Sequence, residues 1–286
     1  MKKLQIYNLE SSIDFFLDAV HRKRSPQYNQ WPSTAVENQI RALFDEYEMK
    51  LNSNTLEQMS APFSLQPSDE DNLSGLYSFD ALKFRKLYLF LTTTSNNVVN
   101  NICPYCYLEP SETFDHFIPK KPFPHFSANP QNLIPCCSKC NSKKNDDWRA
   151  TQRGKNVRLF LNAYIDDVMN QNFLQVAFSY PNNNIVPSFS ISQNGMPQDI
   201  FDIVESHFNR LDLATRYSDN SNKVIVELGN LIKALKRSGM DDDDIKKGLL
   251  EAMEEDEKTF GLNHWETVLK KACITDPVAY NYLISH

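Results

Sequence analysis

The sequence from Cys103 to Asp146 reads CPYCYLEPSETFDHFIPKKPFPHFSANPQNLIPCCSKCNSKKND. It holds five of the chain's six cysteines. Four of these form two Cys-x-x-Cys pairs, Cys103 with Cys106 and Cys137 with Cys140. Clustered pairs of this kind are typical of metal sites rather than of a disulfide framework. Four thiolates suit tetrahedral Zn²⁺, so we predict that the two pairs bind a structural zinc ion.

The spacing of the two pairs indicates that further structure lies between them. Roughly 30 residues separate the pairs, more than the about 15–20 of a compact zinc ribbon. Without apolar periodicity this segment buries little apolar area, so we expect zinc rather than a hydrophobic core to hold it. Cys136 is left out of the ligand set because three residues separate it from Cys140. Two unrelated reduced pairs are the alternative interpretation.

The residue types in and just after this loop suit phosphodiester hydrolysis. The reaction needs a base for water, and a neutral imidazole such as His116 is the usual choice. It also needs a hard cation on the scissile phosphate. One carboxylate and one amide carbonyl hold such a cation and leave positions for water and phosphate. Asp115 and Asn141 supply that pair of ligands.

The order of the motifs resembles that of the HNH (ββα-metal) nuclease family. C-x-x-C, D-H-x-x-P, N-L-x-P and C-x-x-C-N-x-x-K follow one another over about a sixth of the chain. The resemblance implies that His116 is the general base and that Asp115 and Asn141 bind catalytic Mg²⁺ or Mn²⁺. It also implies that Asn132 braces the loop between two strands and so orients His116. Hydrolysis by this route leaves a 5′-phosphate and a 3′-hydroxyl.

The charge of the chain favours a local site for an anionic substrate. The chain has a net charge of −6, whereas the segment 103–155 has eight basic residues against five acidic ones. Phosphate contacts of such a patch give salt-sensitive affinity without sequence preference. Lys144 matches the basic position that ends the family motif, and we expect it and Lys143 to contact phosphate. The chain has only 7 glycines and neither GxGxxG nor GxxxxGK[ST], which argues against glycine-rich nucleotide loops.

Apolar periodicity predicts a mainly helical α+β chain, and the resemblance implies an inserted zinc-stabilised ββα-metal module. We divide it into a helical N-terminal region (1–77), the HNH module (78–160) and a C-terminal region (161–286) that begins with a β-hairpin. Residues 52–75, rich in Ser, Asn, Pro and Asp, are expected to form a connecting loop. Strands are predicted at Leu174–Tyr180 and Ile185–Ile191. The helices predicted after them are Asp199–Leu213, Ser221–Arg237, Asp241–Glu255 and Asn263–Cys273.

Localisation and partners follow from composition and from a second resemblance. No signal peptide and no apolar run long enough to cross a bilayer is evident, so we predict a cytoplasmic protein without membrane contact. Large helical flanks around a small nuclease motif resemble HNH effectors of bacterial antiviral systems. The HNH subunit of Septu-type systems, which works with an ATPase partner, is one example. We therefore expect nucleic acid and an ATPase as partners.

Two alternatives stay open. A non-catalytic zinc-knuckle module that binds nucleic acid or assembles a complex would need the cysteines alone, and none of Asp115, His116, Asn132 or Asn141. It predicts zinc alone, whereas the nuclease interpretation predicts zinc and a weaker Mg²⁺ or Mn²⁺ site.

The stretch 241–257 has nine acidic residues against two lysines. It is either a solvated helix face or a surface that faces away from nucleic acid.

Overall fold

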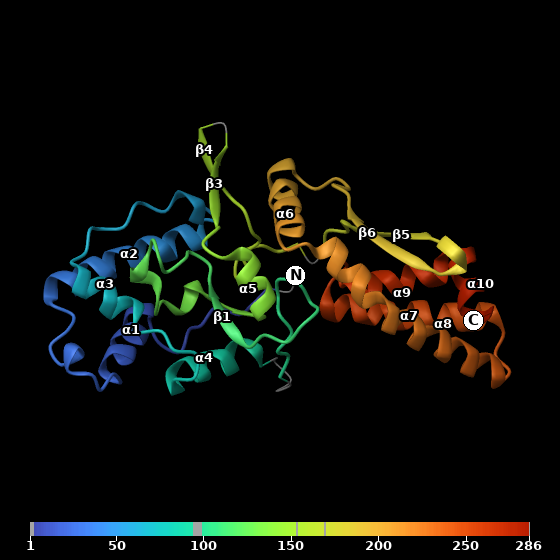
Figure 1. Ribbon diagram of the computed structural model, residues 1–286, viewed down its shortest axis with the longest axis horizontal. Helices are drawn as coiled ribbons and strands as arrows, with labels where there is room; N and C mark the ends of the chain where they lie inside the picture. The colour runs from blue at the N-terminus through green and yellow to red at the C-terminus, as the bar shows by residue number, and fades with distance from the viewer. Residues whose placement is uncertain (1–2, 94–98, 153, 169, 286) are drawn as a thin grey trace. The chain divides into compact units, whose positions relative to one another are not determined.

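The computed structural model describes residues 3–93, 99–152, 154–168 and 170–285. These residues form ten α-helices and six short strands (Figure 1). The chain divides into two compact units, Lys3–Asp166 and Asp167–His286, which we describe in turn. The predicted fold class, mainly helical with small antiparallel strand pairs and a cysteine cluster in the HNH region, is confirmed. The boundaries at 77/78 and 160/161 stay a prediction.

The first unit surrounds the segment quoted above with helices. In α2 the hydroxyl of Ser33 caps the first turn by accepting from the backbone N–H of Val36, and an apolar stripe from Val36 to Leu51 is buried. The expected loop at 52–75 contains a short helix, α3. Its first residue is Pro67, at a position that proline favours. The elements are α1 Ser12–His21, α2 Thr34–Asn52, α3 Pro67–Ser74, α4 Leu82–Thr92, β1 Thr113–His116, β2 Leu133–Cys136, α5 Ser138–Lys144, β3 Arg149–Gln152 and β4 Lys155–Arg158.

A ββα unit positions the chemistry-bearing residues. Strands β1 and β2 pair antiparallel, with Asp115 opposite Ile134 and His116 opposite Leu133, and α5 follows directly (Figure 1). Aromatic rings of α2 pack on Phe126 in the β1–β2 loop. The helical part of the unit therefore supports the loop that the sequence left without apolar periodicity.

The hairpin of β3 and β4 was not predicted. Its strands are four residues each and mostly polar, and Ala150 opposite Val157 is its one apolar pair. Gly154 in the connection has a φ of 76°, a backbone conformation that glycine adopts without strain. Strands this short lack the alternation that marks a strand in sequence.

The second unit packs a hairpin against helices. The two predicted strands are confirmed as an antiparallel pair, and α7 begins eight residues before the predicted position. The ring of Tyr217 stacks on Trp265 at 5.7 Å in its core. Among the described residues, no helix combines the length and the apolar character that a membrane span requires. The elements are β5 Leu174–Ser179, β6 Val186–Ile191, α6 Gln198–Arg210, α7 Leu213–Arg237, α8 Asp242–Phe260, α9 Trp265–Thr275 and α10 Pro277–Ser285.

Candidate active site and zinc centre

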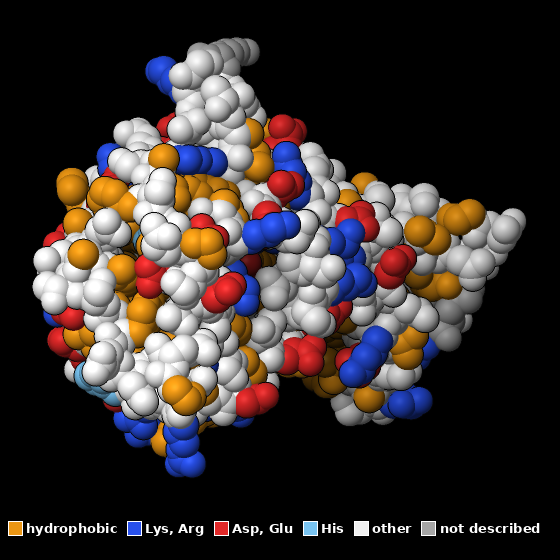
Figure 2. Space-filling view, turned by 60° about the vertical axis from the view of Figure 1, so that its left-hand side comes forward, with side chains coloured by type: hydrophobic (Ala, Val, Ile, Leu, Met, Phe, Trp, Pro, Cys, Tyr) orange, Lys and Arg blue, Asp and Glu red, His pale blue; other side chains and the backbone are white. Residues whose placement is uncertain are grey.

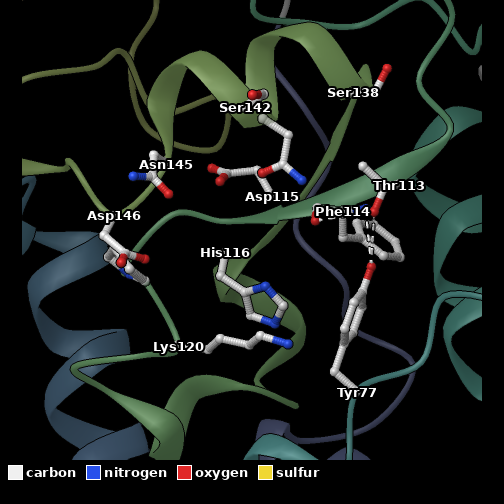
Figure 3. A pocket seen from close by; sticks show the side chains of 12 residues that line it. Tyr77, Thr113, Phe114, Asp115, His116, Lys120, Ser138, Ser142, Asn145 and Asp146 are labelled. Carbon is white, nitrogen blue, oxygen red and sulfur yellow. Dashed lines mark hydrogen bonds between the residues drawn. The ribbon is translucent and has the colours of Figure 1, made fainter.

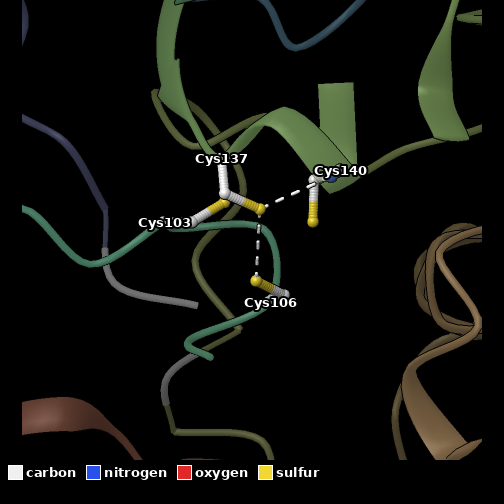
Figure 4. A group of neighbouring side chains, drawn as sticks. All are labelled: Cys103, Cys106, Cys137 and Cys140. Carbon is white, nitrogen blue, oxygen red and sulfur yellow. Dashed lines mark hydrogen bonds between the residues drawn. The ribbon is translucent and has the colours of Figure 1, made fainter. Parts of the chain in front are cut away.

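The two Cys-x-x-Cys pairs meet in one buried cluster. The Sγ atoms of Cys103, Cys106, Cys137 and Cys140 all lie within 4.8 Å of one another, and none of these cysteines forms a disulfide (Figure 4). Zinc–sulfur bonds of about 2.3 Å in a tetrahedron place the sulfurs about 3.8 Å apart. The Sγ atoms of Cys106 and Cys137 are 3.8 Å apart. The four thiols therefore fit zinc, and Cys136 lies outside the set.

A pocket of about 420 Å³ opens between β1 and α5. Asp115, His116 and Asn141 line it together, as the sequence analysis expects of a catalytic group and two ligands of one cation. In Figure 3 the side chain of Asp115 lies on the side of β1 that faces Ser142 of α5, whereas the imidazole of His116 lies on the other side of the strand, near Lys120. The other lining residues are Tyr77, Thr113, Phe114, Pro119, Lys120, Ser138, Asn145 and Asp146.

Both carboxylate oxygens of Asp115 have protein partners. The hydroxyl of Tyr105 donates to Oδ2 at 2.7 Å, and the ammonium of Lys144 lies 3.1 Å from Oδ1. The same ammonium donates to the backbone carbonyl of His116 at 3.1 Å. Because each carboxylate oxygen has further lone pairs, these contacts leave it able to bind a cation from the pocket side.

The imidazole of His116 has a defined tautomer. Its Nε2 lies 3.1 Å from the carbonyl oxygen of Ser127. Since a carbonyl only accepts, Nε2 bears the proton and Nδ1 retains its lone pair. Among the described residues, no group donates to Nδ1. Burial lowers the pKa of His116 to about 3, so the ring is neutral at physiological pH.

Asn132 lies behind the pocket and binds the start of the loop that follows β1. Its amide oxygen accepts from the backbone N–H of Ile118 at 2.8 Å, and its amide nitrogen donates to the carbonyl of the same residue at 2.9 Å. The hydroxyl of Tyr47 also donates to the amide oxygen. Asn132 is fully buried. It thus fixes the loop whose Ser127 carbonyl binds His116, and it does not line the pocket.

Asn141 and Asp115 are the residues that fit a catalytic cation. Asn141 lies in α5, directly after the zinc-site residue Cys140, and its side chain is partly exposed to the pocket. One carboxylate and one amide oxygen are hard ligands of the type that Mg²⁺ and Mn²⁺ prefer. With only two protein ligands, such a cation keeps several positions for water and phosphate.

The two lysines expected to contact phosphate have different environments. Lys143 is exposed on the last turn of α5. The side chain of Lys144, by contrast, is completely buried in its ion pair with Asp115. Its ammonium therefore lies under the pocket rather than on its surface. The sequence motif has its basic position at Lys144, but it does not indicate that this side chain is buried.

Two residues that line the pocket and one that lies behind Asp115 were given no individual role from the sequence. Lys120 lines the pocket and lies beside the imidazole of His116 in Figure 3. The ring of Tyr77 meets that imidazole edge-on at 4.7 Å. Tyr105 touches Asp115 from inside the zinc knuckle. The sequence did hold two signals for these residues. Lys120 is a basic residue four positions after His116, and Tyr105 is an aromatic residue between two zinc-site cysteines.

The face of the molecule that Figure 2 shows has mixed charge. Its basic and acidic side chains are interspersed rather than gathered into one large area of a single sign. The charged residues that line the pocket itself are Lys120, Asp115 and Asp146. Attraction of phosphate therefore depends on a few local groups, which predicts modest and salt-sensitive affinity.

The segment that builds the zinc centre and the pocket is also the segment that comparison with known proteins identifies. The family model for HNH endonuclease matches residues 103–147. Septu protein PtuB of Bacillus thuringiensis is 40% identical over 50 residues, which are 16% of this chain and 20% of that protein. Protein ea31 of Escherichia phage lambda is 27% identical over 146 residues, 47% of each.

Both alignments leave more than half of each protein unmatched, since they span a fifth and just under half of these relatives. No solved structure matches the chain significantly. The similarity to these relatives therefore covers only part of the chain. The ββα order, the four-cysteine cluster and the family match agree on the same residues. The chain carries an HNH endonuclease domain at residues 103–147.

Proposed function

We propose that this protein is a metal-dependent endonuclease that hydrolyses phosphodiester bonds of nucleic acid, with DNA the favoured substrate. The observation that carries the proposal is the imidazole of His116, which lines the same pocket as Asp115 and Asn141 and whose Nδ1 is left unprotonated by the hydrogen bond of Nε2 to Ser127. A zinc module that only binds needs none of these three groups.

His116 acts as the general base. Its ring is anchored through Nε2 to Ser127, so Nδ1 is the atom that takes the proton from the attacking water. An anionic phosphate in the pocket favours the protonated imidazole, which helps a buried ring to accept that proton. Tyr77 packs against the ring and restricts its rotation.

Asp115 and Asn141 would hold the catalytic cation. A bound Mg²⁺ or Mn²⁺ supplies a positive charge next to the scissile phosphate and so stabilises the leaving oxygen. Lys143, exposed on α5, and Lys120, in the pocket, are placed to attract the flanking phosphates. Neither residue distinguishes one base from another, so the proposed cleavage has little sequence preference of its own.

Cleavage by a His116→Ala variant tests the proposal. Wild type with Mg²⁺ or Mn²⁺ should cut plasmid DNA, single-stranded DNA or RNA and leave 5′-phosphate ends, which end-labelling detects. Loss of a general base lowers such rates by about 10²–10⁴-fold. His21→Ala, which changes an exposed histidine at the end of α1, is the matched control and should cut like wild type. Equal cleavage by His116→Ala and wild type would refute the assignment.

Metal content separates this function from a purely structural zinc module. The proposal requires zinc and, in addition, a weaker Mn²⁺ site that Asp115→Asn removes. A module that only binds nucleic acid or assembles a complex would bind zinc alone. Equilibrium dialysis against Mn²⁺, followed by elemental analysis, distinguishes the two.

We further propose a role as an antiviral effector that works in the cytoplasm with an ATPase partner. The similarity of 50 residues to Septu protein PtuB supports this role. None of the six cysteines forms a disulfide, which suits a reducing compartment. Protection of bacteria from phage by wild type but not by His116→Ala, together with co-purification of an ATPase, would support it. Equal plating of phage on both strains would contradict it.

A further inference from the structure

The zinc knuckle contacts the proposed catalytic site through the side chain of Tyr105. Tyr105 lies between the zinc-site residues Cys103 and Cys106, and its hydroxyl donates to Oδ2 of Asp115 at 2.7 Å. We propose that Tyr105 is a positioning residue through which the zinc centre orients Asp115 toward the catalytic cation. The inference rests on the proposed function, since it assigns Asp115 to that cation.

The knuckle holds Tyr105 firmly. The backbone N–H of Tyr107 donates to the carbonyl of Cys103 at 2.9 Å and closes the turn around it. The side chains of Cys103 and Cys106 are both fully buried, and only 2% of Tyr105 is exposed. With zinc on both cysteines the turn has little freedom. The hydroxyl of Tyr105 is therefore a fixed donor rather than a mobile one.

The carboxylate of Asp115 needs such a donor. The terminal torsion of an aspartate is broad, so an isolated carboxylate rotates easily. Here Tyr105 binds one oxygen, and the buried ammonium of Lys144 binds the other at 3.1 Å. Two partners on two oxygens fix the plane of the carboxylate. Partners of this kind orient a metal ligand, and their loss typically lowers metal affinity or activity by about 10–100-fold.

The second proposed ligand, Asn141, is also connected to the zinc centre. Asn141 follows Cys140 directly in α5, and Cys137 caps the start of that helix by accepting from the backbone N–H of Cys140. Tyr105 connects Asp115 to the other pair of cysteines. The four-cysteine cluster therefore sets the relative positions of Asp115 and Asn141, in addition to stabilising the fold.

Binding of Mn²⁺ to the full zinc-loaded chain tests the inference. We compare wild type, Tyr105→Phe, Tyr164→Phe and Asp115→Asn by electron paramagnetic resonance of free and bound Mn²⁺. Tyr164 is a matched control, because it is equally buried in the same unit and its hydroxyl donates to the carbonyl of Leu133, which is not among the residues that line the pocket. Tyr105→Phe should bind Mn²⁺ about tenfold more weakly than wild type. Tyr164→Phe should bind it like wild type.

Zinc content and cleavage add readouts that a structural role would not give. Tyr105→Phe should keep one zinc ion per chain, and excess Mn²⁺ should restore most of its cleavage. Loss of zinc from Tyr105→Phe would contradict the inference, because the residue would then stabilise the knuckle itself. Mn²⁺ affinity equal to that of wild type would also contradict it.

The Mn²⁺-binding results distinguish a failure of this inference from a failure of the proposed function. If Asp115→Asn binds Mn²⁺ as tightly as wild type, Asp115 is not a ligand, and the proposed site falls along with the inference. If Asp115→Asn loses the site while Tyr105→Phe retains full affinity, only the positioning role of Tyr105 is wrong.

Discussion

Replacing Lys144 with methionine should destabilise the first unit strongly, because it leaves the carboxylate of Asp115 buried without its counter-charge. The ammonium lies 3.1 Å from Oδ1, and the two side chains are 0% and 2% exposed. Removing one partner of a buried ion pair costs about 3–5 kcal/mol. Tyr105 still donates to Asp115 in the variant, so we expect the lower end, about 3 kcal/mol. For a unit of this size that lowers the Tm by roughly 10 °C.

Urea unfolding of the zinc-loaded protein measures this loss, and Lys143→Met is the control. Lys143 is adjacent in sequence but exposed, so its replacement should change the free energy of unfolding by less than about 0.5 kcal/mol. The double variant Lys144→Met/Asp115→Asn removes both charges. It should be more stable than the sum of the two single changes predicts, since neither charge is left alone.

Two results would refute this reasoning. Equal stability of Lys144→Met and Lys143→Met would mean that the ion pair contributes nothing. Additive effects of Lys144→Met and Asp115→Asn, with a coupling below about 0.5 kcal/mol, would mean that the two side chains do not interact in solution.

The other predictions concern the zinc centre and the loop. Cys140→Ser should lose zinc and the ordered structure of the knuckle around it, because the four thiolates join its two Cys-x-x-Cys turns; elemental analysis and circular dichroism check this, and full zinc occupancy would contradict it. Asn132→Ala should lower the stability by about 2–4 kcal/mol and also slow cleavage, because Ile118 loses two buried hydrogen-bond partners and the loop that holds His116 loosens. Unfolding and cleavage are measured on the same sample, and unchanged values of both would count against the bracing role.

The sequence predicts the zinc centre well because its chemistry is local. The residue type alone identifies the cysteines of the two Cys-x-x-Cys pairs as zinc ligands, and the structure brings all four sulfurs together. Asp115, His116 and Asn141 line one pocket because the ββα order places β1 next to α5. The sequence did not predict the direction of each side chain or its hydrogen-bond partners.

Burial and long-range contacts account for what the sequence did not predict. The motif predicts a positively charged residue at Lys144, but only the packing of the fold determines that its ammonium points inward to Asp115. Tyr105 looks like a spacer between cysteines until the fold brings it to Asp115, ten residues away. The helix α3 buries only Asn72 and Leu73, so it has no apolar stripe that periodicity detects.

Anomalous diffraction from crystals of the His116→Ala variant soaked in Mn²⁺ tests the central claim most directly. We expect a manganese peak in the pocket at about 2.1 Å from oxygens of both Asp115 and Asn141, the distance typical of such small hard cations. A zinc peak among the four cysteine sulfurs serves as the internal reference. Manganese elsewhere, or Asp115 and Asn141 too far apart to share one ion, would contradict the account.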